Sequence, residues 1–219
     1  MGITAHKLRR SLANAGGPRA FEVIYGSQQD VTSPSSPTTF TSLDFGDENS
    51  ERSIVIAIAS RDARVTGVTI GGITATQMYE GIEDTGYVIP EFWVASVPTG
   101  TSGNVVVSYT DTPDWMSISS YICYSLDTTP YDTASDSNAT PSVTIDVPSN
   151  GAILAVGTCA NPYDSSTWTG VTTDYALDVA GDGASSGSIS ELSAQTGRTV
   201  SNNNVGTIQS IAVMSLQSI

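Results

Sequence analysis

Short apolar runs separated by turn-forming residues recur along most of this chain. Ile54 to Ala59 is an uninterrupted apolar run with charged residues on either side, which predicts a central strand buried on both faces. Two further runs flank Gly71-Gly72, a pair that tolerates the positive φ angles of a two-residue hairpin turn. The same pattern predicts strands at 39–45, 53–60, 68–70, 73–76, 91–97, 104–109, 116–125, 142–147 and 152–159, with further candidates at 167–169, 174–179, 186–193 and 207–216.

No helical pattern interrupts these strands, so the predicted fold class is all-β, an antiparallel, jelly-roll-like β-sandwich. One helix is possible near the N-terminus, over residues 3–15, where small and apolar residues recur at helical spacing. Residues 26–37 contain two prolines and four serines and are interpreted as part of a linker. The expected organisation is an arm over 1–20, a linker over 21–37 and a β-sandwich domain over 38–219.

A faint internal repeat is visible in the sequence. The apolar run at 54–59 leads to Thr-Gly-Val-Thr at 66–69, and the run at 152–156 leads to the same four residues at 169–172. Two similar halves would suit a sandwich, but four-residue matches arise easily by chance in a chain rich in Thr and Val. The repeat therefore carries little weight at this point.

Charge is distributed unevenly along the chain, which has 22 acidic and 8 basic residues and a formal net charge of −14. The first twenty residues contain no Asp or Glu and carry four cations, Lys7, Arg9, Arg10 and Arg19. The rest of the chain has four arginines against all 22 carboxylates, a formal charge of −18. Such a body repels phosphates, so we expect no nucleic acid partner.

The residue types that most catalytic schemes require are scarce. The single histidine and the single lysine, His6 and Lys7, both lie in the arm, so Ser-His-Asp, Cys-His and lysine-based nucleophilic schemes lack their base in the predicted domain. The sequence contains no Walker or GxGxxG loop. We therefore expect no enzymatic activity and no cofactor.

Carboxylate-only chemistry remains open, because a glycosidase needs just two acids on opposite sides of a sugar bond. Glu91, which precedes Phe92 and Trp93, is the leading candidate for such an acid. The favoured alternative is that Glu91 is an outward polar residue at the start of a strand whose aromatic side chains point inward.

Metal binding has weak support in the sequence. Cys123 and Cys159 sit in apolar strand-like runs without nearby histidine, so buried thiols are favoured over zinc ligands, and they could pair only if their strands face each other closely. Asp178 and Asp182 could contribute to a calcium site, but their spacing does not match an EF-hand loop. A solvated turn is favoured there, and we expect no metal.

Trp115 and Trp168 each follow a turn-like segment, which could place them at sheet edges. Exposed there, their rings could contact a partner protein or stack on a glycan. The default alternative is that they cover the ends of the core.

We expect no membrane partner and a protein made and retained in a cytoplasm. No window reaches the roughly 18 continuous apolar residues of a membrane span, and residues 1–17 lack the apolar region of a secretory signal.

Two segments, 68–76 (Val-Thr-Ile-Gly-Gly-Ile-Thr-Ala-Thr) and 92–106 (Phe-Trp-Val-Ala-Ser-Val-Pro-Thr-Gly-Thr-Ser-Gly-Asn-Val-Val), resemble jelly-roll structural proteins of tailed phages and gene transfer agents. The resemblance covers about residues 50–160 and rests on the succession of strand-forming and turn-forming residues, not on functional residues. Some of these proteins decorate heads or form fibres. The resemblance thus implies a virion structural protein, assembled in the host cytoplasm, whose partner is the major capsid protein or another virion protein, and a homotrimer is one possible assembly.

On this interpretation the sandwich is displayed outward and the arm attaches it to the particle. The candidate capsid-anchoring residues are Lys7, Leu8, Arg9, Arg10, Leu12 and Arg19. Two other hypotheses stay open: a carbohydrate-binding tail, collar or fibre module that recognises host glycans through Trp115 and Trp168, and a polysaccharide hydrolase.

Overall fold

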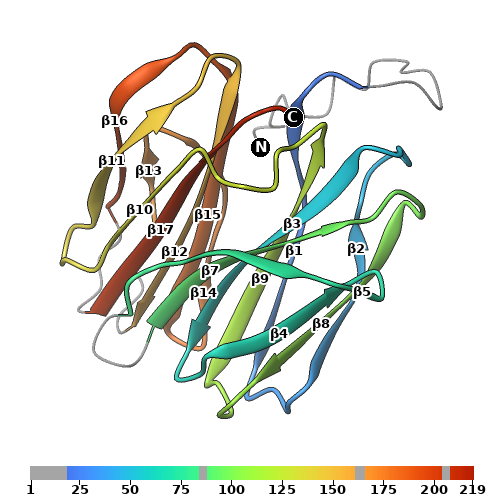
Figure 1. Cartoon of the computed structure of the whole chain (residues 1–219). Helices are drawn as coiled ribbons and strands as arrows, with labels where there is room; N and C mark the ends of the chain where they lie inside the picture. The colour runs from blue at the N-terminus through green and yellow to red at the C-terminus, as the bar shows by residue number, and fades with distance from the viewer. Residues whose placement is uncertain (1–18, 84–87, 161–165, 204–207) are drawn as a thin grey trace, which may run out of the picture.

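A computed structural model describes residues 19–83, 88–160, 166–203 and 208–219, and its described part contains strands and no helix (Figure 1). The possible helix over 3–15 lies outside the described residues. No described helix is long and apolar enough to cross a membrane. All strand pairs are antiparallel, so the predicted all-β antiparallel sandwich is confirmed.

The chain forms two successive halves, each with a large and a small sheet. In the first half the large sheet has the order β1-β9-β3-β7-β6 and the small sheet the order β2-β8-β4-β5. The strands are β1 (Glu22–Thr32), β2 (Thr38–Asp44), β3 (Arg52–Arg61), β4 (Val65–Ile70), β5 (Ile73–Thr74), β6 (Thr76–Glu80), β7 (Val88–Ser96), β8 (Ser102–Tyr109) and β9 (Trp115–Tyr124).

The second half repeats this plan, with β10-β17-β12-β15-β14 as its large sheet and β11-β16-β13 as its small sheet. Its strands are β10 (Asp132–Asp136), β11 (Ser142–Val147), β12 (Gly151–Ala160), β13 (Trp168–Thr169), β14 (Thr172–Val179), β15 (Asp182–Leu192), β16 (Gln195–Asn202) and β17 (Ile208–Leu216). Replacing each strand of the first large sheet by its counterpart reproduces the strand order of the second.

Strand register shows that the two halves are structural repeats. The pairing of β6 with β7 shifts between Gln77 and Tyr79, and the pairing of β14 with β15 shifts in the same way between Thr173 and Tyr175. Tyr79 and Tyr175 are therefore equivalent. The runs at 54–59 and 152–156, a repeat to which the sequence alone gave little weight, do correspond, because they form the middle strands β3 and β12. The matching Thr-Gly-Val-Thr segments are not equivalent, since Thr172 corresponds by register to Thr76.

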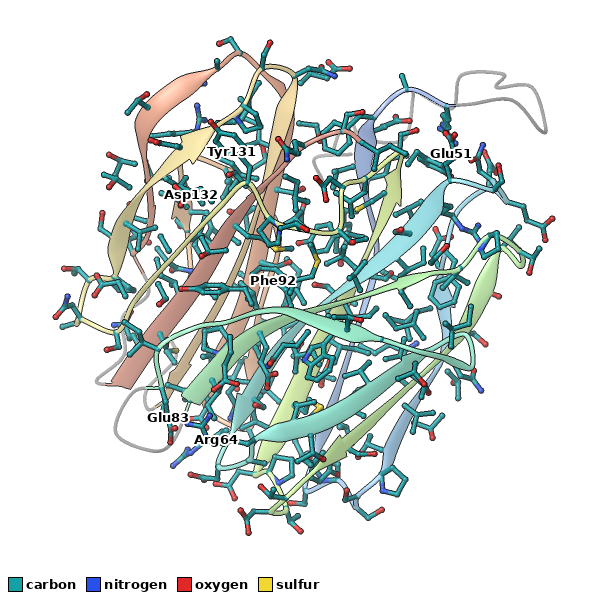
Figure 2. The ribbon with its side chains drawn as sticks, in the orientation of Figure 1. Glu51, Arg64, Glu83, Phe92, Tyr131 and Asp132 are labelled. Carbon is teal, nitrogen blue, oxygen red and sulfur yellow. The ribbon has the colours of Figure 1, made fainter. Side chains whose placement is uncertain are left out.

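Three apolar cores separate the sheets. A first core lies between the small and large sheets of the first half, and a second core occupies the same place in the second half. Between them an interface core joins the two large sheets face to face (Figure 2, where Phe92 is labelled near its centre). The middle strands are thus covered on both faces, which explains why β3 and β12 are apolar without alternation.

The predicted hairpin at Gly71-Gly72 is present between β4 and β5, and both glycines have positive φ values of 60° and 82°. The predicted linker over 21–37 is wrong for most of its length, because it contains β1, which pairs with β9 at the edge of the first large sheet. Polar residues are tolerated on this edge strand. For example, Gln28 donates to Ser117 Oγ at 3.2 Å.

Both halves have the same orientation, so the molecule has two distinct ends. At the terminal end, the first described residue, Arg19, and the last residue, Ile219, both bind Ser125. At the distal end, Arg61 at the close of β3 binds Asp182 at the start of β15. Figure 1 shows the C-terminus beside the beginning of β1.

The interface core makes a testable prediction. Phe92 is fully buried there, so Phe92→Ala should lower the free energy of unfolding by about 3–5 kcal/mol and destabilise both halves together. Urea unfolding followed through amide resonances of β4 and β16 measures each half separately. The exposed hairpin variant Ile73→Ala is the control and should change stability by less than about 0.5 kcal/mol. Separate midpoints for the two halves in the parent protein would show that the interface does not couple them.

Candidate functional site

Most of the predicted anchoring residues, Lys7, Leu8, Arg9, Arg10 and Leu12, lie outside the described residues. Arg19 is described and belongs to the sandwich. Its guanidinium carbon lies 3.7 Å from the centre of the Tyr124 ring, and its Nη2 is 2.9 Å from Glu22 Oε2. Its carbonyl accepts a hydrogen bond from Ser125. Arg19 therefore joins the first described residues to the body, and its predicted role in anchoring a partner stays a prediction.

Arg52 holds two loops together at the terminal end. Its side chain is completely buried, and its guanidinium donates hydrogen bonds to five backbone carbonyls. Burial lowers the pKa of Arg52, and the nearby phenol and carboxylates oppose this shift. The acceptors are Val97 O at 2.7 Å, Gly46 O at 3.1 Å, Asp47 O at 2.8 Å, Thr99 O at 3.0 Å and Gly100 O at 2.7 Å.

Two carboxylates lie near the loops that Arg52 joins, at the end of the molecule where the described chain begins. Glu51 Oε2 accepts a hydrogen bond from Ser125 Oγ at 2.8 Å, and Glu48 Oε1 accepts one from the Gly100 amide at 2.6 Å. Ile219, beside Ser125, is strongly exposed. The terminal end thus combines two loops joined by Arg52, two carboxylates and an exposed apolar residue, near Arg19, the first described residue. Figure 2 labels Glu51 at this end.

At the distal end, Trp115 is fully buried and is not a contact residue. Its Nε1 donates to Asp182 Oδ2 at 2.6 Å, and Arg61 Nη1 binds the same oxygen at 2.6 Å. This hydrogen bond raises the pKa of Arg61. Asp182 belongs to the second half and its two donors to the first, so the cluster ties the halves together. Trp115 is inaccessible because its side chain faces the interface core between the two large sheets.

Asp182 is only 2% exposed and faces Arg61, so the calcium hypothesis gains no support from it. Asp178 instead accepts a hydrogen bond from the Gly181 amide at 2.6 Å, in the exposed turn that the sequence favoured. Among the described residues, no group of three or more His, Cys, Asp or Glu side chains could hold a metal ion.

Trp168 is also buried, in the second core. Its ring packs across two glycines of the large sheet: a Cβ on Gly157 would lie 3.0 Å from Cζ2, and one on Gly187 would lie 3.4 Å from Cδ1. Because Trp93 is buried as well, none of the three tryptophans offers a ring face for glycan stacking. The prediction that Trp115 and Trp168 form a contact surface is wrong, and the alternative, that they close the cores, fits their burial.

Glu91 points inward, so its interpretation as an outward polar residue is wrong. It is 1% exposed, and its Oε2 accepts hydrogen bonds from Trp93 Nε1 at 2.9 Å and Gln77 Nε2 at 3.0 Å. Burial raises the pKa of Glu91 to about 7 despite these donors. Such a carboxyl can exchange a proton near neutral pH, but its burial leaves no access for a sugar.

Cys123 and Cys159 are both buried thiols, as expected. Cys123 faces the interface core, and burial raises its pKa far above the usual range. A thiol in that state is a poor nucleophile.

No protein-family model, no curated protein and no solved structure matches this chain.

The distal cluster generates a second prediction. Asp182→Asn keeps the side-chain size but removes the charge that faces Arg61, so stability should fall by about 1.5–3 kcal/mol, the usual contribution of a hydrogen bond to a charged group. Chemical denaturation measures the loss. Asp178→Asn, in the exposed turn, is the matched control and should shift stability by less than about 0.5 kcal/mol. Equal effects of the two substitutions would contradict the assigned role of Asp182.

Proposed function

We propose that the protein is a virion structural protein of a tailed bacteriophage, a capsid decoration or head-fibre protein that binds the particle exterior through its N-terminal arm. The observation that carries this proposal is the division of charge between arm and body. The arm holds cations without carboxylates, whereas the described body uses its cations internally.

Each described arginine is engaged within the chain. Arg19 and Arg52 fix the terminal end, and Arg61 and Arg64 bind carboxylates at the distal end. Arg198 donates to Gly170 O and Gln195 Oε1. The remaining cations are Lys7, Arg9 and Arg10, which precede the described residues. Attraction to an acidic shell surface would therefore come from the arm, together with burial of Leu8 and Leu12.

The position of the arm supports the same arrangement. Residues 1–18 join the body at Arg19, at the terminal end, so attachment there would direct the distal end away from the particle. The proposed partner is the major capsid protein or another virion structural protein. An acidic body of this kind disfavours nucleic acid, and we propose no membrane partner.

A binding role also fits the chemistry of the body better than catalysis does. Glu91 and Asp182, the acids with the most unusual surroundings, are both buried, and His6 and Lys7 precede the described residues. The glycan-binding alternative had depended on Trp115 and Trp168, and their burial leaves it without an observation in its favour.

Deleting residues 1–18 tests the proposal. The deletion spares Arg19 and its contacts with Tyr124 and Glu22, so the thermal unfolding temperature should change little, while co-sedimentation with particles that lack the native protein should be lost. Leu8→Asp combined with Leu12→Asp should have the same effect. Raised salt should weaken attachment only in part, because it screens the charged contribution and leaves the apolar one.

Arg198→Gln is the control, since it removes a cation of the body that lies outside the arm. It should leave attachment at the parental level. If the protein lacking residues 1–18 still occupies particles normally, the attachment surface lies on the sandwich and the arm proposal is wrong.

A further inference from the structure

Glu91 is a buried carboxyl in a strand pair at the edge of the molecule. It lies on β7 and faces the first core on the same side as Trp93. Oε2 has two donors, Trp93 Nε1 and Gln77 Nε2, whereas Oε1 is buried without a hydrogen-bond partner. Gln77 belongs to β6, a five-residue edge strand whose ladder runs along β7. The carboxyl therefore sits directly at the junction between β6 and the rest of its sheet.

The charged neighbours of Glu91 do not neutralise it. Glu80 of β6 is its partner in the strand register and raises its pKa further. Arg64, from the loop between β3 and β4, binds Glu80 and Glu83. Figure 2 labels Arg64 and Glu83, which lie near each other. From β3 the register partner is the apolar Ile58. From β4 the Val65 backbone amide lowers the pKa of Glu91, against the larger effect of burial. Burial has the largest effect on the pKa of Glu91, and no nearby cation among the described residues offsets it.

The second half shows that the fold does not require an acid here. Tyr79 pairs with Phe92, and the equivalent Tyr175 pairs with Ser186, so Phe92 and Ser186 occupy equivalent positions. The residues that precede them are Glu91 and Ser185. Ser185 therefore occupies the position of Glu91. The two donors are replaced as well: Gly187 stands for Trp93 and Thr173 for Gln77. At these three positions the second half therefore has small neutral residues.

We propose that Glu91 makes the edge strand β6 responsive to pH: the neutral carboxyl keeps β6 paired with β7, and the ionised carboxylate draws water into the junction and loosens β6. This inference stands apart from the proposed function, because it depends on Glu91, Gln77 and Trp93 and not on the arm.

The direction of the pH effect follows from the position of the carboxyl. Its pKa in the folded protein is about 7, above the ordinary value of 4.5, because burial disfavours the charged form. The stabilising contribution of the neutral form is therefore complete below about pH 4.5 and is lost as the pH rises to about 7. The loss should be local, because β6 pairs along its length only with β7 among the described strands.

Hydrogen exchange on the full chain tests the proposal, with β14 as an internal control in the same molecule. Protection factors, which correct for the intrinsic pH dependence of exchange, are measured at pH 5.5 and pH 8.5. The protection of β6 amides relative to β14 amides should fall by about thirtyfold, because about 1.5 pKa units of linkage lie between pH 5.5 and the folded pKa of about 7. Glu91→Gln should abolish this fall, while Glu83→Gln, which changes a carboxyl outside the junction, should preserve it. A constant ratio in the parent protein would overturn the proposal.

A second measurement needs no variant at residue 91. The Trp93 indole N–H donates to the carboxyl, so its resonance in the parent protein, assigned with Trp93→Phe, should shift with a midpoint near pH 7. A resonance that is unchanged from pH 5 to 8.5, or that titrates with the midpoint of an ordinary carboxyl, would refute the assignment.

Discussion

Face-to-face burial of the two large sheets is the constraint on which the rest of the structure depends. It makes each large sheet an inner layer, covered on one side by its small sheet and on the other by the opposite half. Strands β3 and β12 are consequently apolar on both faces. The same contact aligns the halves and thereby separates a terminal end, which carries Arg19 and Ile219, from a distal end closed by Arg61 and Asp182.

The two halves keep one plan while their side chains diverge. Equivalent tyrosines make similar contacts across the interface: Tyr79 donates to Ser135 Oγ at 2.9 Å, and the Tyr175 hydroxyl accepts from Ser117 Oγ at 3.3 Å. At other positions, comparison of the two halves identifies residues that only one half contains. Glu91 has a serine as its counterpart, so its burial is an addition to the common scaffold that the scaffold itself does not demand.

Strand positions could be predicted from the sequence because alternation, apolar runs and glycine pairs are local signals, as the hairpin at Gly71-Gly72 illustrates. The edge strand β1 was missed because solvent on its open side permits a polar sequence. The burial of Asp182 was missed for a different reason. Its hydrogen-bond donor Trp115 lies 67 residues away in the sequence, and sequence alone does not show that the two side chains meet. The repeat left only a faint trace in the sequence, and strand register established it.

Counting copies of the protein in purified particles tests the central claim most directly. A decoration protein occupies sites repeated over the shell, so quantitative mass spectrometry against a labelled standard should find on the order of hundreds of copies per particle, which fits many identical sites for the arm. About a dozen copies or fewer would place the protein in a tail, collar or fibre. Absence of the chain from purified particles would contradict the account.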